Sequence, residues 1–282
     1  MYKRQVIPPS IGFIIFGVVG GVSITKLFVA GIFPGLLMAL SLVATWWWVS
    51  RRDAFRVAER LGMRQRLSTM GAGIWALVLP FIIIIGLKGG VFTPTEAGVV
   101  AAFYALFVGA FIYRELTFAK VYHALLATAK TTAVVMFLVA AAFVSAYLIT
   151  VADIPSQLKA IFMPFMDSPK MLMAIMMVVV IIVGTALDFI PSVLILTPVM
   201  LPVCMEAGID PIYFGVLFIM NNAIGMITPP VGVVLNVAAG VGKVSMEDVI
   251  RGVMPFMLAE SVLLFLLVLF PELVLLPMQW LR

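Results

Sequence analysis

Residues 225–232 read GMITPPVG, and this stretch decides the fold because it sets two adjacent prolines inside otherwise apolar sequence. Proline removes a backbone donor and clashes with the preceding helical turn, so a membrane helix cannot run unbroken through Pro229-Pro230. In lipid, broken backbone is tolerated only where protein buries it or where it lines a cavity. The stretch therefore predicts a discontinuous helix at a functional site.

The same pattern occurs 221 residues earlier, at Pro8-Pro9. Applying that offset to two glycines and one proline that follow the first pair gives two glycines and one proline that follow the second. Discontinuous helices at corresponding positions of two repeats are typical of secondary transporters, whose binding site lies at the breaks. The matched residues are Gly21, Gly31 and Pro34 in the first copy and Gly242, Gly252 and Pro255 in the second.

The composition is that of a membrane protein. Of 282 residues, 64% are hydrophobic and 11% are charged, and the mean hydropathy is +1.21. A soluble domain carries about 25% charged residues. A spanning helix takes ~20 residues, so we predict an all-α polytopic membrane protein with roughly six to eight crossings. The single cysteine, Cys204, excludes an internal disulfide.

A cluster of arginines sets the predicted orientation. It follows Trp46-Trp47-Trp48, and tryptophans collect at the membrane interface whereas basic residues collect on the cytoplasmic side. The apolar run 28–49 therefore goes inward, so the broken helix before it goes outward. Counting the membrane crossings that follow makes the broken helix at 211–242 run inward. The two broken helices then have opposite directions, which predicts an inverted repeat. Miscounting by an odd number of crossings would give them the same direction. The cluster comprises Arg51, Arg52, Arg56, Arg60, Arg64 and Arg66.

The same count places the loop 88–95 outside the membrane. Thr95 is predicted to cap the helix that follows this loop. Glu96 is favourable in the first turn of that helix, where the helix dipole attracts negative charge.

Residues 171–204 are apolar but are interrupted by DFIPS at residues 188–192. Each half has ~13–17 residues, which extends about 20–25 Å as a helix and falls short of the ~30 Å hydrocarbon core. The pattern favours a re-entrant hairpin that enters from outside and turns near the middle. A pair of full crossings is the alternative.

Polar residues within the apolar runs are the candidates for function. A carboxylate at the hairpin turn predicts a substrate contact, with an N-cap of the following helix as the alternative or additional role. The asparagine pair two turns before the second break either lines a cavity or bonds between helices. Glu260, in the last long helix, is interpreted as part of a buried structural pair, with a proton site as the alternative. The predicted substrate-binding residues are Asp188, Pro191, Ser192, Asn221 and Asn222.

Four stretches together resemble the large membrane subunit of TRAP (tripartite ATP-independent periplasmic) transporters over about residues 6–281. They are GGVFTPTEA at 89–97, GTALD at 184–188, LILTP at 194–198 and GMITPPVG at 225–232, in the family's order. The resemblance implies an inverted-repeat, elevator-type secondary transporter of the bacterial inner membrane. It also implies that sodium drives uptake of an organic acid (a dicarboxylate, sialic acid or another carboxylate). The implied partners are a periplasmic substrate-binding protein and a small membrane subunit.

The resemblance also implies two sodium sites made of hairpin tips and broken-helix backbone. The complete site would use Gly184 from the hairpin and Gly225, Thr228 and Val231 from the second break.

The first sodium site would use Ile7 and Ser10, with a preceding glycine and an earlier hairpin. Arg4 stands where the family pattern has that glycine, and the earlier hairpin is not in this chain. We therefore expect an incomplete first site and an N-terminally truncated chain.

The predicted organisation has four parts. Residues 1–27 are the remnant of the first broken helix in the transport domain, and residues 28–150 are scaffold and connecting helices. Residues 151–245 are the transport domain of the second repeat, with the hairpin and the broken helix. Residues 246–282 are an interfacial arm and the last transmembrane helix.

Two other function classes are weighed against the sodium-coupled, non-enzymatic transporter. The permease subunit of an ATP-driven importer predicts a cytoplasmic coupling helix with a glycine-rich turn, and the basic segment 51–66 has no such turn. An intramembrane enzyme using Asp188 needs a second aspartate facing it, and Asp153 is predicted to lie at the surface. Motifs for metal hydrolysis, for a serine triad and for nucleotide phosphates do not occur in the sequence.

Overall fold

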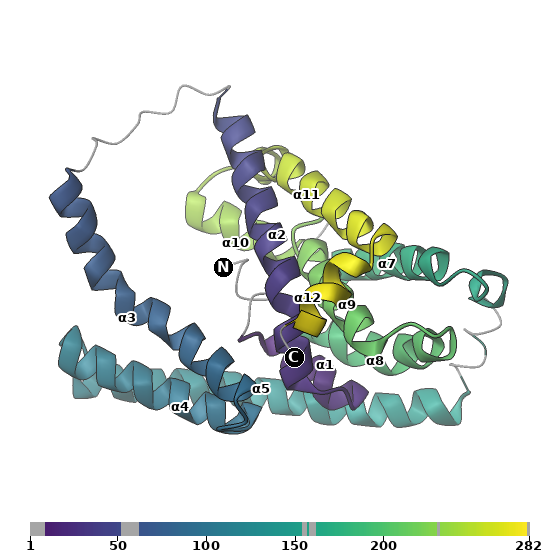
Figure 1. Cartoon of the computed structure of the whole chain (residues 1–282), viewed down its shortest axis with the longest axis horizontal. Helices are drawn as coiled ribbons and strands as arrows, with labels where there is room; N and C mark the ends of the chain where they lie inside the picture. The colour runs from purple at the N-terminus through teal and green to yellow at the C-terminus, as the bar shows by residue number, and fades with distance from the viewer. Residues whose placement is uncertain (1–8, 52–61, 154–156, 158–161, 230–231, 281–282) are drawn as a thin grey trace. The chain divides into compact units, whose positions relative to one another are not determined.

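The computed structural model describes residues 9–51, 62–153, 157, 162–229 and 232–280, and all regular structure in these ranges is helical (Figure 1). Six of the helices found there are long and apolar enough to cross a membrane, namely α2, α4 with its π-helical end, α5, α7, α8 and α11. The predicted all-α polytopic class is therefore confirmed. The elements are α1 (Ile11–Gly20), α2 (Ile24–Ser50), α3 (Met63–Lys88), α4 (Pro94–Phe107), the π-helix Val108–Ile112, α5 (Phe118–Val151), the 3-10 turn Met163–Phe165, α7 (Pro169–Ala186), α8 (Phe189–Glu206), α9 (Pro211–Gly225), α10 (Val233–Gly242), α11 (Met246–Leu269) and α12 (Glu272–Trp280).

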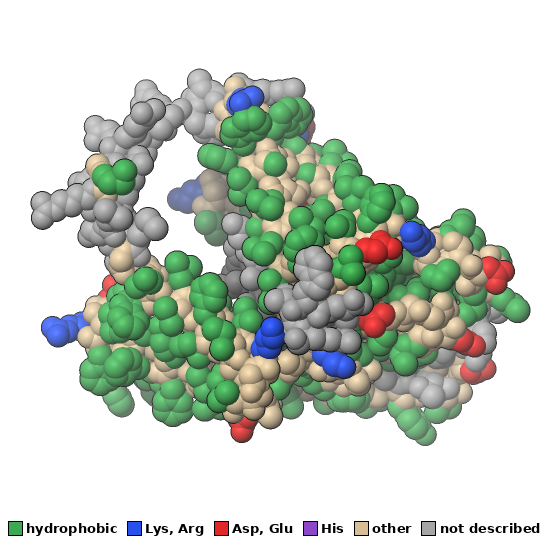
Figure 2. All heavy atoms as spheres, in the orientation of Figure 1, with side chains coloured by type: hydrophobic (Ala, Val, Ile, Leu, Met, Phe, Trp, Pro, Cys, Tyr) green, Lys and Arg blue, Asp and Glu red, His purple; other side chains and the backbone are tan. Residues whose placement is uncertain are grey.

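The outer faces of the helices are apolar, as a lipid environment requires. On α2, Leu36, Leu40, Val43 and Trp47 recur at helical spacing, and each is more than half exposed. Figure 2 shows hydrophobic side chains over most of the visible face, with few charged side chains among them.

The chain divides into two compact units, one formed by Met1–Val49 and Met136–Arg282 and the other by Ser50–Val135. The predicted division into transport and scaffold parts follows different boundaries and stays a prediction.

In the Ser50–Val135 unit, α3 and α4 form a helical hairpin. The Tyr104 hydroxyl of α4 donates to the Trp75 carbonyl of α3 at 2.7 Å. The cap of α4 is Thr93 rather than the predicted Thr95: the Thr93 side chain accepts from the Glu96 backbone, and the Glu96 carboxylate accepts from the Thr93 backbone at 2.7 Å. Pro94 in the first helical position moves the helix start two residues earlier than the sequence suggested.

The core of the larger unit is built around α9, whose residues from Ile212 to Gly225 are all buried. Asp210 caps α9 by accepting from the backbone of Ile212 and Tyr213, and Pro211 occupies the first helical position. Helices α1, α7, α8 and α11 pack against α9. The rings of Phe16 on α1 and Phe218 on α9 lie 5.7 Å apart between centroids.

Helices α7 and α8 are joined by only Leu187 and Asp188. Each helix has 18 residues, slightly more than the sequence suggested, and each meets the length and hydropathy of a span. A re-entrant hairpin and two full crossings are both compatible with these lengths, so the re-entrant hairpin stays a prediction.

The helical ladder is interrupted at the second diproline, as predicted. Helix α9 ends at Gly225 and α10 begins at Val233, after Gly232 in a left-handed conformation with φ of 41°. At the first diproline, Pro9 and Ser10 precede α1, whereas Pro8 and the sequence before it lie outside the described residues.

The two copies of the repeat share a succession of elements. A ten-residue helix, α1 or α10, ends in a left-handed residue, Gly21 or Lys243. A long helix with an internal proline follows, α2 with Pro34 or α11 with Pro255. The shared succession agrees with an internal repeat, and its inverted orientation in the membrane stays a prediction.

Candidate functional site

The backbones of α7 and α9 meet at Gly184 and Gly225. A Cβ atom placed on Gly225 would lie 2.9 Å from the Gly184 Cα, and one placed on Gly184 would lie 3.2 Å from the Gly225 Cα. Only glycine leaves room for two backbones at that distance. The structure therefore brings together the hairpin glycine and the broken-helix glycine predicted to share an ion site.

Thr228 lies three residues beyond this crossing, inside the break. Its backbone N–H donates to the Gly225 carbonyl at 3.0 Å, and its hydroxyl donates to the Ile224 carbonyl at 2.9 Å. Because the hydroxyl proton is directed to Ile224, the lone pairs of the Thr228 oxygen remain available to a cation or a donor. Val231, the fourth residue of this predicted site, lies outside the described residues.

The described residues contain no group of three or more His, Cys, Asp or Glu side chains able to hold a metal ion. The oxygen donors at the crossing are backbone carbonyls and the Thr228 hydroxyl. Carbonyls of unwound helix are the donors that transporters use for sodium, so the residues present at this site fit that ion.

Asp188 caps α8, because its carboxylate accepts from the Phe189 backbone at 2.8 Å. The N-cap alternative is therefore confirmed. The Asp188 side chain is exposed, so a substrate contact stays open as a prediction. Pro191 is half-buried in the first turn of α8, and Ser192 beside it is fully buried. The Ser192 hydroxyl has no hydrogen-bond partner among the described residues.

The two asparagines of α9 are buried but bond differently. The Asn221 amide donates to the Met177 carbonyl of α7 at 2.6 Å, whereas the Asn222 amide donates to the Phe218 carbonyl of its own helix at 3.0 Å. Asn221 thus fulfils the predicted bond between helices. The Oδ1 atoms of both residues have no partner within the described part of the chain, so both can accept a hydrogen bond.

The start of α1 packs on the start of α8, a contact that the sequence reasoning missed. A Cβ atom on Gly12 would lie 2.6 Å from the ring of Phe189, the residue after Asp188. Ser10, predicted for the first ion site, is buried just before α1. Ile7 lies outside the described residues. A glycine early in an apolar helix was the available signal for this close approach.

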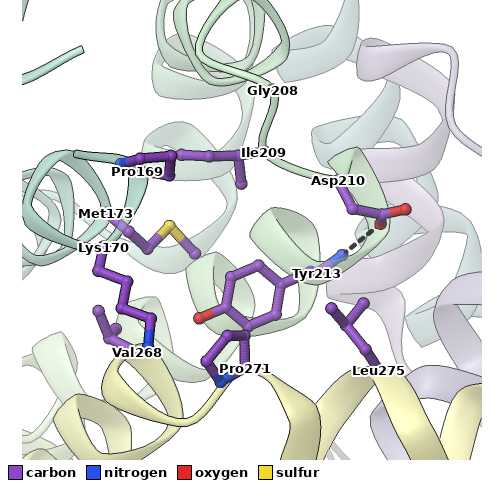
Figure 3. Close-up of a pocket in the computed structure, with 10 residues that line it drawn as sticks. All are labelled: Pro169, Lys170, Met173, Gly208, Ile209, Asp210, Tyr213, Val268, Pro271 and Leu275. Carbon is purple, nitrogen blue, oxygen red and sulfur yellow. Dashed lines mark hydrogen bonds between the residues drawn. The ribbon is translucent and has the colours of Figure 1, made fainter. Parts of the chain in front are cut away.

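A cavity of about 150 Å³ lies at the other end of α9. Figure 3 shows the Tyr213 ring at its centre, with Lys170 on one side and Leu275 on the other. The Lys170 ammonium donates to the Leu269 carbonyl and the Tyr213 hydroxyl donates to the Leu267 carbonyl, both at 2.9 Å. The lining residues are Pro169, Lys170, Met173, Gly208, Ile209, Asp210, Tyr213, Val268, Pro271 and Leu275.

This cavity is separate from the predicted ion and substrate site. None of the predicted site residues lines it, and Tyr213 precedes Gly225 by twelve residues, which is about 18 Å along a helix. The two polar contacts at the cavity bind the beginnings of α7 and α9 to the last turn of α11, whose carbonyls lack helical partners.

Replacing Tyr213 by Phe tests that contact. The change removes the hydrogen bond to the Leu267 carbonyl and keeps the ring, so we expect a loss of about 0.5–1.5 kcal/mol in the free energy of unfolding. Tyr147→Phe, at a position that is 69% exposed, is the control and should change little. Thermal unfolding in detergent measures both, and equal effects of the two changes would argue against a contribution from the bond.

Comparison with known proteins identifies the family. A sequence model described as "Tripartite ATP-independent periplasmic transporter, DctM component" matches residues 4–273. The chain is 54% identical over 277 residues to the 2,3-diketo-L-gulonate TRAP transporter large permease protein YiaN of Escherichia coli K12, covering 98% of this chain and 65% of that protein. It is 35% identical to the C4-dicarboxylate TRAP transporter large permease protein DctM of Pseudomonas aeruginosa, covering 98% and 64%. It is 34% identical to the sialic acid TRAP transporter large permease protein SiaM of Vibrio cholerae, covering 96% and 63%.

The matches run through both copies of the repeat and both glycines of the α7–α9 crossing. The chain spans about two thirds of the length of these relatives. All three relatives are named as permease proteins, which agrees with the prediction of a multi-pass membrane protein. The six long apolar helices can supply its membrane spans. The chain therefore belongs to the family of TRAP transporter large permease subunits, which are proteins of the bacterial inner membrane.

Proposed function

We propose that the chain is the ion- and substrate-handling part of a sodium-coupled permease that imports an organic acid. The observation that carries the proposal is the contact between Gly184 and Gly225 beside the break at Thr228. Backbone contact at that point gathers the oxygen atoms of two helices around one position, which is what a desolvated sodium ion needs. The ion would be held by backbone oxygens near Gly184, Gly225 and Val231 and by the Thr228 hydroxyl.

The relatives support an organic-acid substrate. The names of three of them specify 2,3-diketo-L-gulonate, C4-dicarboxylates and sialic acid, all of which are carboxylates. The Ser192 hydroxyl is buried one turn after the start of α8 and has no partner among the residues that the structure describes, so it is available to donate to a carboxylate. The positive end of the α8 dipole lies at the same place, although Asp188 offsets part of it.

We further propose an elevator movement in which the predicted second-repeat transport domain moves as one body with the helices packed on its core. Helix α9 is buried against α1, α7, α8 and α11, so these five helices share one core and cannot shift independently without exposing it. A binding protein outside would deliver the acid, and a small membrane subunit would brace the scaffold. The inverted repeat would give the two end states of this movement similar energies.

Reconstituted vesicles test the proposal. They contain the complete permease, its small membrane partner and the binding protein, and uptake of labelled diketogulonate, C4-dicarboxylates and sialic acid is followed. Uptake should require an inward sodium gradient and should proceed without ATP. Uptake that needs ATP and ignores sodium would reject the proposal in favour of an ATP-driven importer.

Replacing Thr228 by Ala tests the ion site directly. The change removes one oxygen donor and leaves the backbone of the break in place, so we expect sodium activation of uptake to weaken about five- to tenfold, equivalent to ~1–1.4 kcal/mol of binding. Thr228→Ser retains the hydroxyl, so its sodium activation of uptake should remain close to that of the original protein.

The matched control for this change is Thr128→Ala. Thr128 makes the same kind of bond, from its hydroxyl to the carbonyl four residues earlier at 2.8 Å, on the exposed surface of α5. Its removal should leave the sodium dependence unchanged. An unaltered sodium dependence in Thr228→Ala vesicles of equal protein content would exclude Thr228 from the ion site.

A further inference from the structure

Glu260 is the one acidic or basic side chain that is fully buried within the described part of the chain. It lies fourteen residues into the 24-residue helix α11, a candidate membrane span. Neither carboxyl oxygen has a hydrogen-bond partner among the described residues that meets ordinary distance and angle. The proposed ion and substrate site makes no use of this group.

The basic groups on α11 and on α7 lie too far along their helices to neutralise Glu260. Arg251 is bound to Glu247 at 2.6 Å and precedes Glu260 by nine residues, about 13 Å along the helix. Lys170 is bound to the Leu269 carbonyl, nine residues beyond Glu260. The structural pair expected for Glu260 therefore has no charged partner in the described residues.

The other helices packed on α11 offer no charge either. Helix α10 contains no titratable residue, and Lys243 follows its end. The only titratable group of α9 is Tyr213, whose hydroxyl is bound to the Leu267 carbonyl seven residues beyond Glu260, about 10 Å along the helix. On α2, Lys26 lies fifteen residues before Ser41 and Arg51 ten residues after it, about 22 Å and 15 Å.

The polar group that interacts with Glu260 is the Ser41 hydroxyl of α2. Helices α2 and α11 are the corresponding long helices of the two repeats. With the offset of 221 residues, Glu260 corresponds to Ala39 and Ser41 to Val262. Two polar residues therefore face each other between equivalent helices, where the repeat counterparts of both are apolar.

An unpaired ionised carboxylate in such a place costs several kcal/mol, and a buried acid neutralises instead when it can. One carboxyl and one hydroxyl supply far fewer oxygens than the roughly six that a hard metal cation takes. A proton needs only the carboxyl. The acid then gains an O–H donor, and the Ser41 oxygen can accept from it.

We propose that Glu260 is a proton-binding site, in which the carboxyl takes one proton from water, holds it at neutral pH and donates a hydrogen bond to Ser41 that ties α11 to α2. Loss of the proton leaves a buried anion to which the Ser41 hydroxyl can donate, but this single bond does not offset the cost of removing the charge from water. The proposal does not depend on sodium coupling or on the identity of the transported acid.

The sign of the pH dependence follows from proton counts. In the unfolded chain a glutamate releases its proton near pH 4.3, so at neutral pH the folded chain binds one proton more than the unfolded chain. Stability therefore falls as the pH rises through the neutral range, by up to about tenfold in the folding equilibrium for each pH unit.

The test compares the original permease, Glu260→Gln and Ser41→Ala, each purified with its small membrane partner in lipid nanodiscs. At neutral pH, the infrared difference spectrum between the original and Glu260→Gln should contain the carbonyl band of a protonated carboxylic acid. Unfolding is followed by the dye labelling of Cys204, which is buried in the folded chain. The original should become less stable as the pH rises from about 5 to neutral, and Glu260→Gln should lose that dependence.

Glu247→Gln is the matched control, since Glu247 lies on the same helix and is 72% exposed; it should retain the pH dependence of the original. If Glu260→Gln does not fold, Ser41→Ala supplies the difference spectrum, in which loss of the hydroxyl should shift the carboxylic acid band. Carboxylate bands alone at neutral pH would overturn the proposal. So would stability that rises with added sodium or potassium at constant pH in the original and not in Glu260→Gln.

Discussion

Gly225→Ala is expected to reduce uptake about tenfold or more and to lower the free energy of unfolding by roughly 1–3 kcal/mol. The new Cβ would lie 2.9 Å from the Gly184 Cα and 3.0 Å from its carbonyl carbon. These are backbone atoms of α7, which cannot rotate away as the end of a side chain can. The helices α7 and α9 must then separate, and the proposed ion site separates with them.

Gly240→Ala is the control for this change. Gly240 lies in α10, where an added Cβ meets nothing within 4 Å. Alanine is the better helix former by up to about 1 kcal/mol, so this variant should be unchanged or slightly more stable. Sodium-driven uptake and thermal unfolding in detergent measure both variants. A Gly225→Ala protein with normal uptake would show that close approach of α7 and α9 is not required for transport.

Asn221→Ala is expected to lower the free energy of unfolding by about 1–2 kcal/mol and to reduce uptake with it. Asn221 is fully buried, and its amide donates to the Met177 carbonyl of α7 at 2.6 Å. Alanine removes the donor and leaves a small void between α7 and α9. The loss therefore acts on the same pair of helices as the crossing at Gly225.

Asn222→Ala provides the comparison one position along the chain. Asn222 is equally buried, but its amide donates to the Phe218 carbonyl of its own helix. A substitution there removes no bond between helices, and alanine is the better helix former, so we expect less than half the loss of stability seen for Asn221→Ala. Thermal unfolding measures both variants. A larger loss of stability in Asn222→Ala would show that the Asn222 side chain contributes more to the free energy of unfolding than the hydrogen bond of Asn221 does.

The break after Gly225 could be predicted from the sequence because its cause is local. Two adjacent prolines remove helical backbone hydrogen bonds in any surroundings. Gly232 can adopt the left-handed conformation that precedes the start of α10. The N-cap role of Asp188 was likewise available, since a short acidic side chain before an apolar helix has few other local uses.

Contacts between distant segments could not be predicted from composition or spacing. The packing of Gly12 on Phe189 depends on where α1 meets α8, and the cavity around Tyr213 depends on three stretches of sequence that meet only in the folded chain. The error at Thr95 had a local cause: both Thr93 and Thr95 are good caps, and the proline between them decides in favour of the first. The pairing of Gly184 with Gly225 came from the family resemblance.

Helix α9 has no face left for lipid, since every residue from Ile212 to Gly225 is buried by protein. During synthesis α9 leaves the ribosome before α11, one of the helices that covers it. Until α11 arrives, the side of α9 that α11 covers, including the Tyr213 hydroxyl, lacks its protein cover within the membrane. The order of the helices along the chain therefore makes completion of the core a late step of biogenesis, and nascent chains that stop before α11 present an unfinished core to the quality-control machinery of the membrane.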